Sequence, residues 1–281
     1  MRFLILGDLH GKEPKIFYSD FDAIISPGDF CSDNLRKYMF KSLKENTKNS
    51  TNVPWYKSIG EKKAKELIKE SISDGRKVLK KLNSFNVPVY IVPGNWDWTK
   101  DEISEWVFLK KDNYSGMIRG LKNIKDVHNK ILTLGGYQII GYGINSGPEY
   151  PIYEEDFKTI KPRELAKIKR AYERNSERIS LLFRESSKQT IFLSHNVPFN
   201  TKLDRINNRK SPRNGYHYGS LIVREVINKY QPLVNIAGHM HENFGRCKIG
   251  KTVCINAGHG NNVNTLMEIK ENKIKMLEFH K

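Results

Sequence analysis

The sequence predicts an α/β fold in which two β-sheets are flanked by helices. Short apolar runs ending at glycine, proline or acidic residues indicate buried strands. Longer segments with apolar residues three and four positions apart indicate helices, and two regions carry antiparallel signals. At 281 residues the chain can bury one large core, so we expect a single domain over residues 1–281.

Five apolar runs are predicted as buried strands, at residues 3–6, 23–26, 87–92, 190–193 and 233–237. Antiparallel pairing is expected for residues 131–134 with 137–142, because Gly135-Gly136 between them favours a tight hairpin. It is also expected for residues 252–255 and on through 265–277, where Glu271-Asn272 separates two alternating runs. These regions supply the edges of the predicted sheets.

Three segments are predicted as helices, at residues 61–85, 163–183 and 220–230. Their apolar stripes are typical of faces that pack on a core. The polar segment 33–60 is expected to be an insertion or a mobile flap. The long loop 196–219 follows His195 directly, which favours a role in binding substrate.

The chain is strongly basic, with a net charge of +17 from 48 Lys and Arg against 31 Asp and Glu. Such a surface attracts polyanions, so a nucleic-acid substrate is one alternative. The basic residues are spread along the sequence rather than packed into one tract, which disfavours that alternative.

The expected compartment is the cytoplasm. No apolar stretch reaches the ~18 residues that a membrane span needs. The apolar run at the start of the chain ends at Gly7-Asp8 after only a few residues, which indicates a first β-strand rather than a signal peptide. The three cysteines form no C-x-x-C motif, so we expect buried free thiols in a reducing environment.

Seven polar side chains cluster at the ends of predicted strands: Asp8, His10, Asp29, Asn95, His195, His239 and His241. Loops that follow strands in open α/β sheets are where such folds place their sites. Carboxylate, amide oxygen and neutral imidazole together form a ligand set for two first-row transition ions. A carboxylate such as Asp29 can bridge two cations, because each of its oxygens can bind one.

The order of these motifs resembles that of the calcineurin-like metallophosphoesterase superfamily. Its pattern runs D-x-H, G-D, G-N-H-(D/E), a lone H and G-H-x-H, and the match here spans residues 5–241. The resemblance implies a four-layer αββα sandwich with two mixed sheets. One position departs from the pattern, since Trp96 stands where the family has a histidine.

The resemblance also implies how the ligands divide between two divalent ions, of Mn, Fe, Ni or Zn. One ion would take Asp8, His10, Asp29 and His241, and the other Asp29, Asn95, His195 and His239. A hydroxide bridging ions ~3.5–4 Å apart would attack phosphorus in line. Asp97 is expected to orient a metal-ligating histidine from behind.

The departure at Trp96 leaves the general acid open, because an indole N–H is a donor but not an acid. His217 or His259 could replace the missing histidine, or good leaving groups could be cleaved without an acid. Trp96 itself could stack on a base or aryl group, or only pack. His128 and His280 have no comparable context and are expected to be structural or on the surface.

The predicted function is hydrolysis of phosphate esters, with a small phosphodiester favoured over a monoester on the family resemblance. Arg205 and Arg213 in the long loop are candidates to grip a phosphate. One alternative is a Mn-dependent nuclease. Another is a binding scaffold without activity, which the complete set of seven ligand-type residues disfavours.

Overall fold

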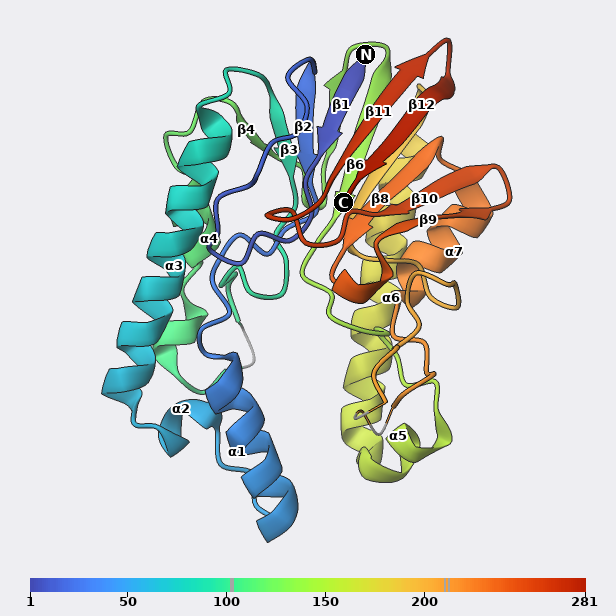
Figure 1. Cartoon of the computed structure of the whole chain (residues 1–281). Helices are drawn as coiled ribbons and strands as arrows, with labels where there is room; N and C mark the ends of the chain where they lie inside the picture. The colour runs from blue at the N-terminus through green and yellow to red at the C-terminus, as the bar shows by residue number, and fades with distance from the viewer. Residues whose placement is uncertain (102–103, 210, 212) are drawn as a thin grey trace.

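The computed structural model describes residues 1–101, 104–209, 211 and 213–281, and shows two six-stranded sheets face to face (Figure 1). The strands of the first sheet are, in spatial order, β12 (Lys273–His280), β11 (Asn264–Lys270), β1 (Arg2–Ile5), β2 (Ala23–Ser26), β3 (Val89–Ile91) and β4 (Ile124–Asp126). The strands of the second are β5 (Ile131–Leu134), β6 (Tyr137–Tyr142), β7 (Thr190–Asn196), β8 (Val234–Gly238), β10 (Thr252–Asn256) and β9 (Gly245–Ile249).

Both sheets are mixed. In the first, β1 to β4 run parallel, and β11 and β12 continue the sheet antiparallel. In the second, β6, β7, β8 and β10 run parallel between antiparallel β5 and β9. Parallel neighbours end at the same edge of a sheet, so the segments after β1, β2 and β3, and after β7 and β8, gather at one end of the two sheets.

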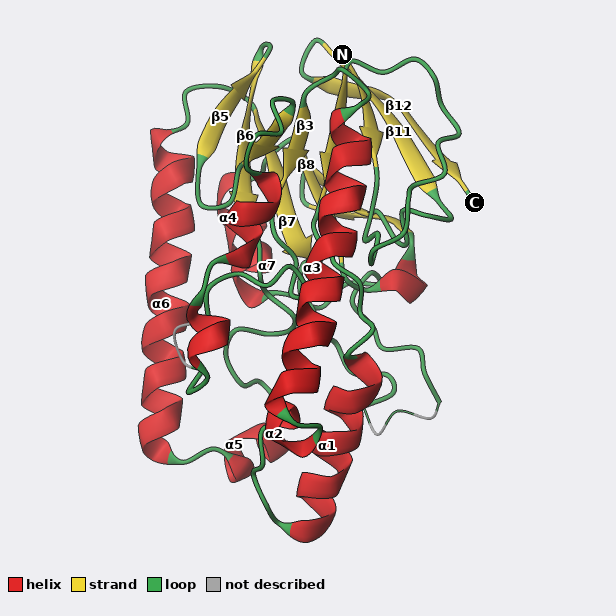
Figure 2. Ribbon diagram, turned by 90° about the vertical axis from the view of Figure 1, so that its left-hand side faces the viewer, coloured by secondary structure: helices red, strands yellow, loops and turns green. Residues whose placement is uncertain are grey.

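Helices cover the outer faces of both sheets (Figure 2). Those on the first sheet are α3 (Glu61–Asn83) and α4 (Asn113–Ile118), and those on the second are α6 (Pro162–Glu185) and α7 (Leu221–Tyr230). The helices α1 (Arg36–Asn49), α2 (Trp55–Ser58) and α5 (Glu154–Thr159) lie beyond the ends of the strands. Within the described part of the chain, each helix is too short or too polar to cross a membrane.

Alternation along the strands creates the four layers. In β1, Phe3 and Ile5 belong to the core between the two sheets, whereas Leu4 packs with residues of α3 and α4 in the outer core of the first sheet. In β7, Ile191 faces the core between the sheets and Phe192 faces the core beneath α6 and α7. Each central strand is therefore buried on both faces.

The predicted αββα sandwich with two mixed sheets is confirmed. The predicted strands, the hairpin and the three predicted helices occur within a few residues of their expected bounds. The polar segment 33–60, expected as an insertion or flap, contains α1 and α2. No helix was predicted there because the segment is polar, rich in Asn, Ser and Thr, and contains Pro54. In the structure, Phe40 and Leu43 of α1 are exposed, so α1 has no core-facing apolar stripe.

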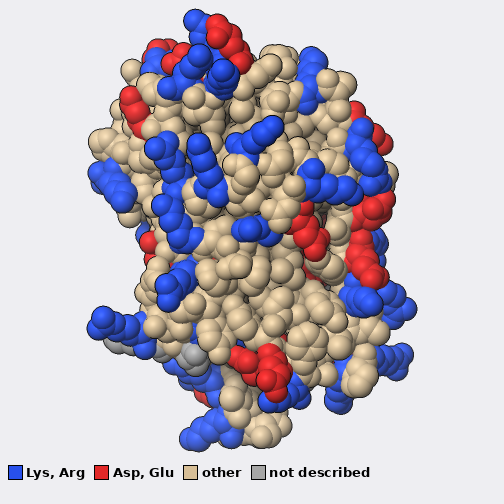
Figure 3. Space-filling model, turned by 90° about the vertical axis from the view of Figure 1, so that its right-hand side faces the viewer, with Lys and Arg blue, Asp and Glu red and all other residues tan. Residues whose placement is uncertain are grey.

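Basic side chains are scattered over the face that Figure 3 shows, among fewer acidic ones. The excess of positive charge on this face is spread out and is not drawn into a single stripe that would follow a nucleic-acid backbone.

Candidate metal centre

The loops at the ends of the strands bring the seven predicted side chains into one cluster, with Asp29 at its centre. Asp29 Oδ2 lies 3.7 Å from His10 Nε2 and 3.6 Å from His195 Nε2. Asp29 therefore belongs to two groups of metal-ligand type, one with Asp8 and His10 and one with His195 and His239. Carboxylates between two sets of imidazoles can join two cations.

The first group lies beside β1. His241 Nε2 is 2.6 Å from Asp8 Oδ2 and 3.3 Å from His10 Nε2. His259 stands next to these residues, with its ring centroid 4.3 Å from that of His241 and 5.4 Å from that of His10. His10, His241 and His259 form a third group whose ligand atoms lie within 4.8 Å of one another. His259, which the sequence analysis considered as an acid, is thus placed where it could bind a metal.

The second group lies at the end of β7. His195 was predicted to follow the strand, but β7 continues through it and its side chain is fully buried. His195 Nδ1 lies 2.8 Å from the carbonyl oxygen of Pro27, to which Nδ1–H can donate. The lone pair of Nε2 is then free, 2.9 Å from Asn95 Oδ1, and the His239 ring centroid is 5.1 Å away. A carbonyl behind one ring nitrogen is the usual way of fixing a metal-ligating histidine.

The backbone of the cluster is strained where its side chains converge. His10, Asp29 and His239 have φ values of 45°, 57° and 65°, which cost roughly 1–3 kcal/mol each for residues other than glycine. Gly94 is required because a Cβ there would lie 2.1 Å from Asp29 Oδ1. Such strain persists only where surrounding contacts enforce it, and it is concentrated at functional sites.

Asp97 supplies much of that enforcement. Its carboxylate accepts hydrogen bonds from four main-chain N–H groups, those of Asp29, Phe30, Cys31 and Gly94, at 2.7–3.0 Å. These hydrogen bonds fasten the loop after β2 to the loop after β3 and so help to set the position of Asp29. The expected role of Asp97 in orienting a metal-ligating histidine stays a prediction.

Burial favours the neutral form of three histidines of the cluster. It lowers the pKa of His10 to about 4 and the pKa of His239 to about 3, and it also lowers the pKa of His195. Only the pKa of His241 is raised, because the hydrogen bond and charge of Asp8 outweigh burial. Neutral imidazoles are the form that binds metals.

The buried carboxylates of Asp8 and Asp29 lie close together, so a bound cation would stabilise their charged forms. Burial, together with the charges of Asp8 and Asp97, raises the pKa of Asp29 well above its ordinary value. Asp8 Oδ1, His10 Nδ1 and His259 Nδ1 are buried without a hydrogen-bond partner within the described chain. Cations would relieve both the repulsion and part of this unmet bonding capacity. The donors present therefore fit a dinuclear metal site.

A family model described as metallophosphoesterase, calcineurin superfamily, matches residues 9–279. The chain belongs to this family. One solved structure, 18% identical to this metallophosphoesterase, superposes with a TM-score of 0.64 and an alignment covering 99% of this chain and 98% of its own. The protein TT1561 of Thermus thermophilus is 14% identical, with a TM-score of 0.55 and coverage of 99% and 97%. These two likenesses show the fold alone, and a comparison with curated proteins finds no significant match.

The metal pocket of this metallophosphoesterase is a cavity of about 230 Å³. Five of the seven predicted ligands line it, namely His10, Asp29, Asn95, His239 and His241. The other lining residues are Arg36, Phe40, Trp96 and Glu242. Arg36, Phe40 and Glu242 were missed by the sequence analysis. Glu242 could have been found from its place beside His241, whereas α1 reaches the pocket only through its path in three dimensions.

The candidates from the long loop do not line this pocket. Arg213 pairs with Asp156 of α5, and its guanidinium lies 5.8 Å from the Tyr218 ring. Arg205 is exposed, and its carbonyl accepts a hydrogen bond from Asn243. Their proposed contacts with phosphate stay predictions.

His217 has a partner in the loop itself. Its Nδ1 lies 2.7 Å from Oδ1 of the fully buried Asp204, which also accepts from the main chain of Asn200, Thr201 and Gly219. Because this network ties the loop together, we expect His217→Ala to lower the free energy of unfolding by about 1–3 kcal/mol. The dependence of turnover on the leaving group should stay unchanged. Denaturant unfolding and a leaving-group series measure the two effects, and a steeper series in the variant would restore His217 as the acid.

The two remaining histidines lie apart from the cluster. His128 Nδ1 accepts a hydrogen bond from the main-chain N–H of Gly143 at 2.9 Å. His280 stacks on Phe17, with ring centroids 3.8 Å apart. Both have local packing partners, which fits the structural or surface role expected of them.

Proposed function

We propose that this protein hydrolyses phosphodiesters with the help of two divalent transition ions held by the cluster around Asp29. The observation that carries the proposal is the position of Asp29 Oδ2, at nearly equal distances from His10 and His195. We assign one ion to Asp8, His10, Asp29 and His241, and the other to Asp29, Asn95, His195 and His239. When bound, such ions supply a hydroxide nucleophile near neutral pH and stabilise charge on the phosphate oxygens.

The chain positions both the ligands and the substrate. Asp97 holds the loop of Asp29, and the Pro27 carbonyl sets the tautomer of His195. Arg36 lines the metal pocket beside Phe40 and Trp96, and its guanidinium can pair with a phosphate oxygen. Its ion pair with Asp33, at 3.5 Å, is exposed and therefore weak.

The charges that line the metal pocket favour a diester. Besides the proposed ligands, the pocket is lined by one cation, Arg36, and one anion, Glu242. Arg36 and Glu242 cancel, and two divalent ions bound by the carboxylates of Asp8 and Asp29 with one hydroxide would leave a single net positive charge. A diester carries one negative charge, which would balance it. A monoester carries up to two, and the second would face Glu242 without a further cation among the described lining residues.

The two alternatives receive less support. A nuclease would be favoured by a continuous basic stripe, and the face in Figure 3 shows scattered cations. A scaffold that had lost its chemistry has no reason to keep buried, strained ligand-type residues at a cost in stability.

The test compares a diester and a monoester with the same leaving group. Protein loaded with Mn, Fe, Ni or Zn should cleave bis-p-nitrophenyl phosphate with a kcat/KM about tenfold above that for p-nitrophenyl phosphate, as roughly 1.4 kcal/mol of charge interaction predicts. Chelator should remove the activity and the metal should restore it. A preference for the monoester would reverse the diester assignment, and two bound ions without turnover on either ester would favour the scaffold.

A further inference from the structure

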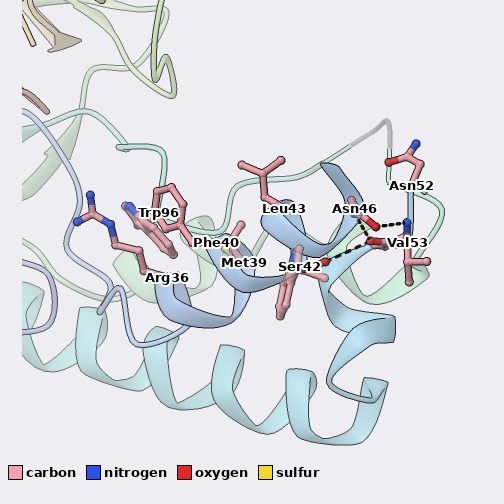
Figure 4. A pocket seen from close by; sticks show the side chains of 11 residues that line it. Arg36, Met39, Phe40, Ser42, Leu43, Asn46, Asn52, Val53 and Trp96 are labelled. Carbon is pink, nitrogen blue, oxygen red and sulfur yellow. Dashed lines mark hydrogen bonds between the residues drawn. The ribbon is translucent and has the colours of Figure 1, made fainter. Parts of the chain in front are cut away.

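A second cavity of about 420 Å³ lies along α1, next to the metal pocket (Figure 4). Its apolar wall, called here the α1 groove, consists of Met39, Phe40, Leu43, Val53, Trp55 and Trp96. Phe40, Leu43 and Val53 are 51%, 59% and 43% exposed. An exposed apolar surface of this kind, rimmed by polar residues, is typical of a binding site.

The groove and the metal pocket share a wall. Arg36, Phe40 and Trp96 line both cavities, and Figure 4 shows these three side chains together at one end of the groove. A molecule that lies in the groove at this end therefore reaches the metal pocket. This continuity points to a part of the substrate as the occupant.

The groove offers little hydrogen bonding to an occupant. The Ser42 hydroxyl lies 3.3 Å from the carbonyl oxygen of Val53 and 3.1 Å from the Ser58 hydroxyl. The Asn46 side chain donates to the Val53 carbonyl at 2.9 Å and accepts from the Val53 N–H at 3.0 Å. A nucleobase is recognised by hydrogen bonds at its edges, and the side chains of Ser42 and Asn46 are already occupied. Asn52 also lines the groove, but it lies at the end away from Arg36 and Trp96. The groove therefore suits an apolar group.

The length of the α1 groove indicates which shape of apolar group would fit it. Its lining residues run from Arg36 to Asn46, which is about 15 Å along a helix at ~1.5 Å per residue. A single aryl ring would fill only part of this length. An extended aliphatic chain would follow it, with its charged end at Arg36.

We propose that the substrate is a phosphodiester with an extended aliphatic chain, and this proposal rests on the function proposed above. The phosphate lies in the metal pocket beside Arg36, and the chain lies along the α1 groove between Phe40, Leu43 and Val53. Burial of the chain supplies binding energy at a distance from the reacting phosphorus.

The test varies the chain and keeps the leaving group constant. Methyl, butyl and octyl p-nitrophenyl phosphates are assayed below the concentrations at which they form micelles. Each methylene moved from water is worth at most about fourfold, so partial burial should raise kcat/KM about 100-fold from methyl to octyl. Leu43→Asn should reduce the octyl-to-methyl ratio at least tenfold. Leu181→Asn is the matched control, since Leu181 is 45% exposed on α6, and it should leave the ratio unchanged.

A binding measurement separates this inference from the proposed function. Titration calorimetry of the metal-free protein should show tighter binding of octylphosphonate than of methylphosphonate, with a negative heat-capacity change that Leu43→Asn reduces. Equal cleavage of esters of all chain lengths would contradict binding of the chain in the α1 groove but would still support the proposed phosphodiesterase activity. Selective binding of octylphosphonate without turnover of any ester would support the α1 groove as a chain-binding site and contradict the proposed phosphodiesterase activity. A chain-length effect that begins only with micelles would also overturn the groove, and would identify α1 as a surface-binding helix.

Discussion

Asp29→Asn should remove nearly all turnover, by at least ~10³-fold, because both metal positions depend on one carboxylate. Asp29 Oδ2 is the atom that lies between His10 and His195, and an amide nitrogen in its place cannot bind a cation. Steady-state kinetics of the metal-loaded variant measures the loss. Elemental analysis should find fewer than two ions per chain in the variant.

The fold should survive this substitution. The amide oxygen of Asn can still accept the hydrogen bond that Trp96 N–H gives to Asp29 Oδ1 at 2.8 Å, and asparagine tolerates a φ of 57° well. The change also removes a carboxyl group that is costly to ionise, because burial and the neighbouring carboxylates raise the pKa of Asp29. The metal-free variant should therefore unfold at a temperature no lower than that of the metal-free wild type.

With metal bound, the wild type should be the more thermally stable of the two proteins, and Asp29→Asn the less stable. Ions that bind only the native state stabilise it by about 4 kcal/mol at 1,000 times Kd, so the wild type should gain thermal stability and the variant much less. Asp20→Asn is the control, since Asp20 is an exposed carboxylate that pairs with Arg2 far from the pocket. Two ions and normal kinetics in Asp29→Asn would refute the assignment of Asp29 as the bridge.

The layers and the position of the cluster could be predicted because both follow from local patterns. Strand runs such as that of β1 are short, apolar and bounded by glycine or acidic residues, and their ends meet at one edge when the strands are parallel. Residue types with strong metal affinity, such as His239 and His241, stand at those ends. Each of these signals is contained in a few neighbouring residues.

The contribution of α1 could not be predicted, because it depends on the path of the chain. Phe40 and Leu43 pack into no core, so α1 lacks the buried stripe that identifies a helix from sequence. Arg36 and Phe40 acquire a role only when the segment after β2 turns back across the metal pocket. Phe40 and Trp96 are far apart in the sequence, so no local pattern indicates that they line the same cavity wall.

Asp97 shows a second limit of prediction. Its four partners are main-chain N–H groups, which every residue but proline carries, so no side-chain pattern reveals where they converge. The match of Asp97 to a family motif predicted that it orients a metal-ligating histidine, but its main-chain partners became visible only in the structure. The same holds for the Pro27 carbonyl behind His195.

Trp96→His should speed the cleavage of esters with poor leaving groups by up to ~10²–10⁴-fold, the usual worth of a positioned acid. Trp96 lines the metal pocket, but its indole N–H cannot supply a proton. The wild type should therefore cleave aryl esters far better than alkyl esters. The substitution should leave the ligands in place, because the contact of residue 96 with Asp29 is made by its main-chain N–H.

The leaving-group dependence of kcat/KM decides this prediction, measured on methyl phosphodiesters whose leaving groups range from nitrophenolate to alkoxide. Trp96→Phe is the matched control, since phenylalanine keeps an apolar ring and adds no acid, and its series should be as steep as that of the wild type. Trp96→His should flatten the series by accelerating the alkyl esters, because nitrophenolate departs without a proton. A flat series in the wild type would contradict the account, since it would require another acid in the pocket. Glu242, which lines the same cavity, would be that candidate, and Glu242→Gln should then steepen the series.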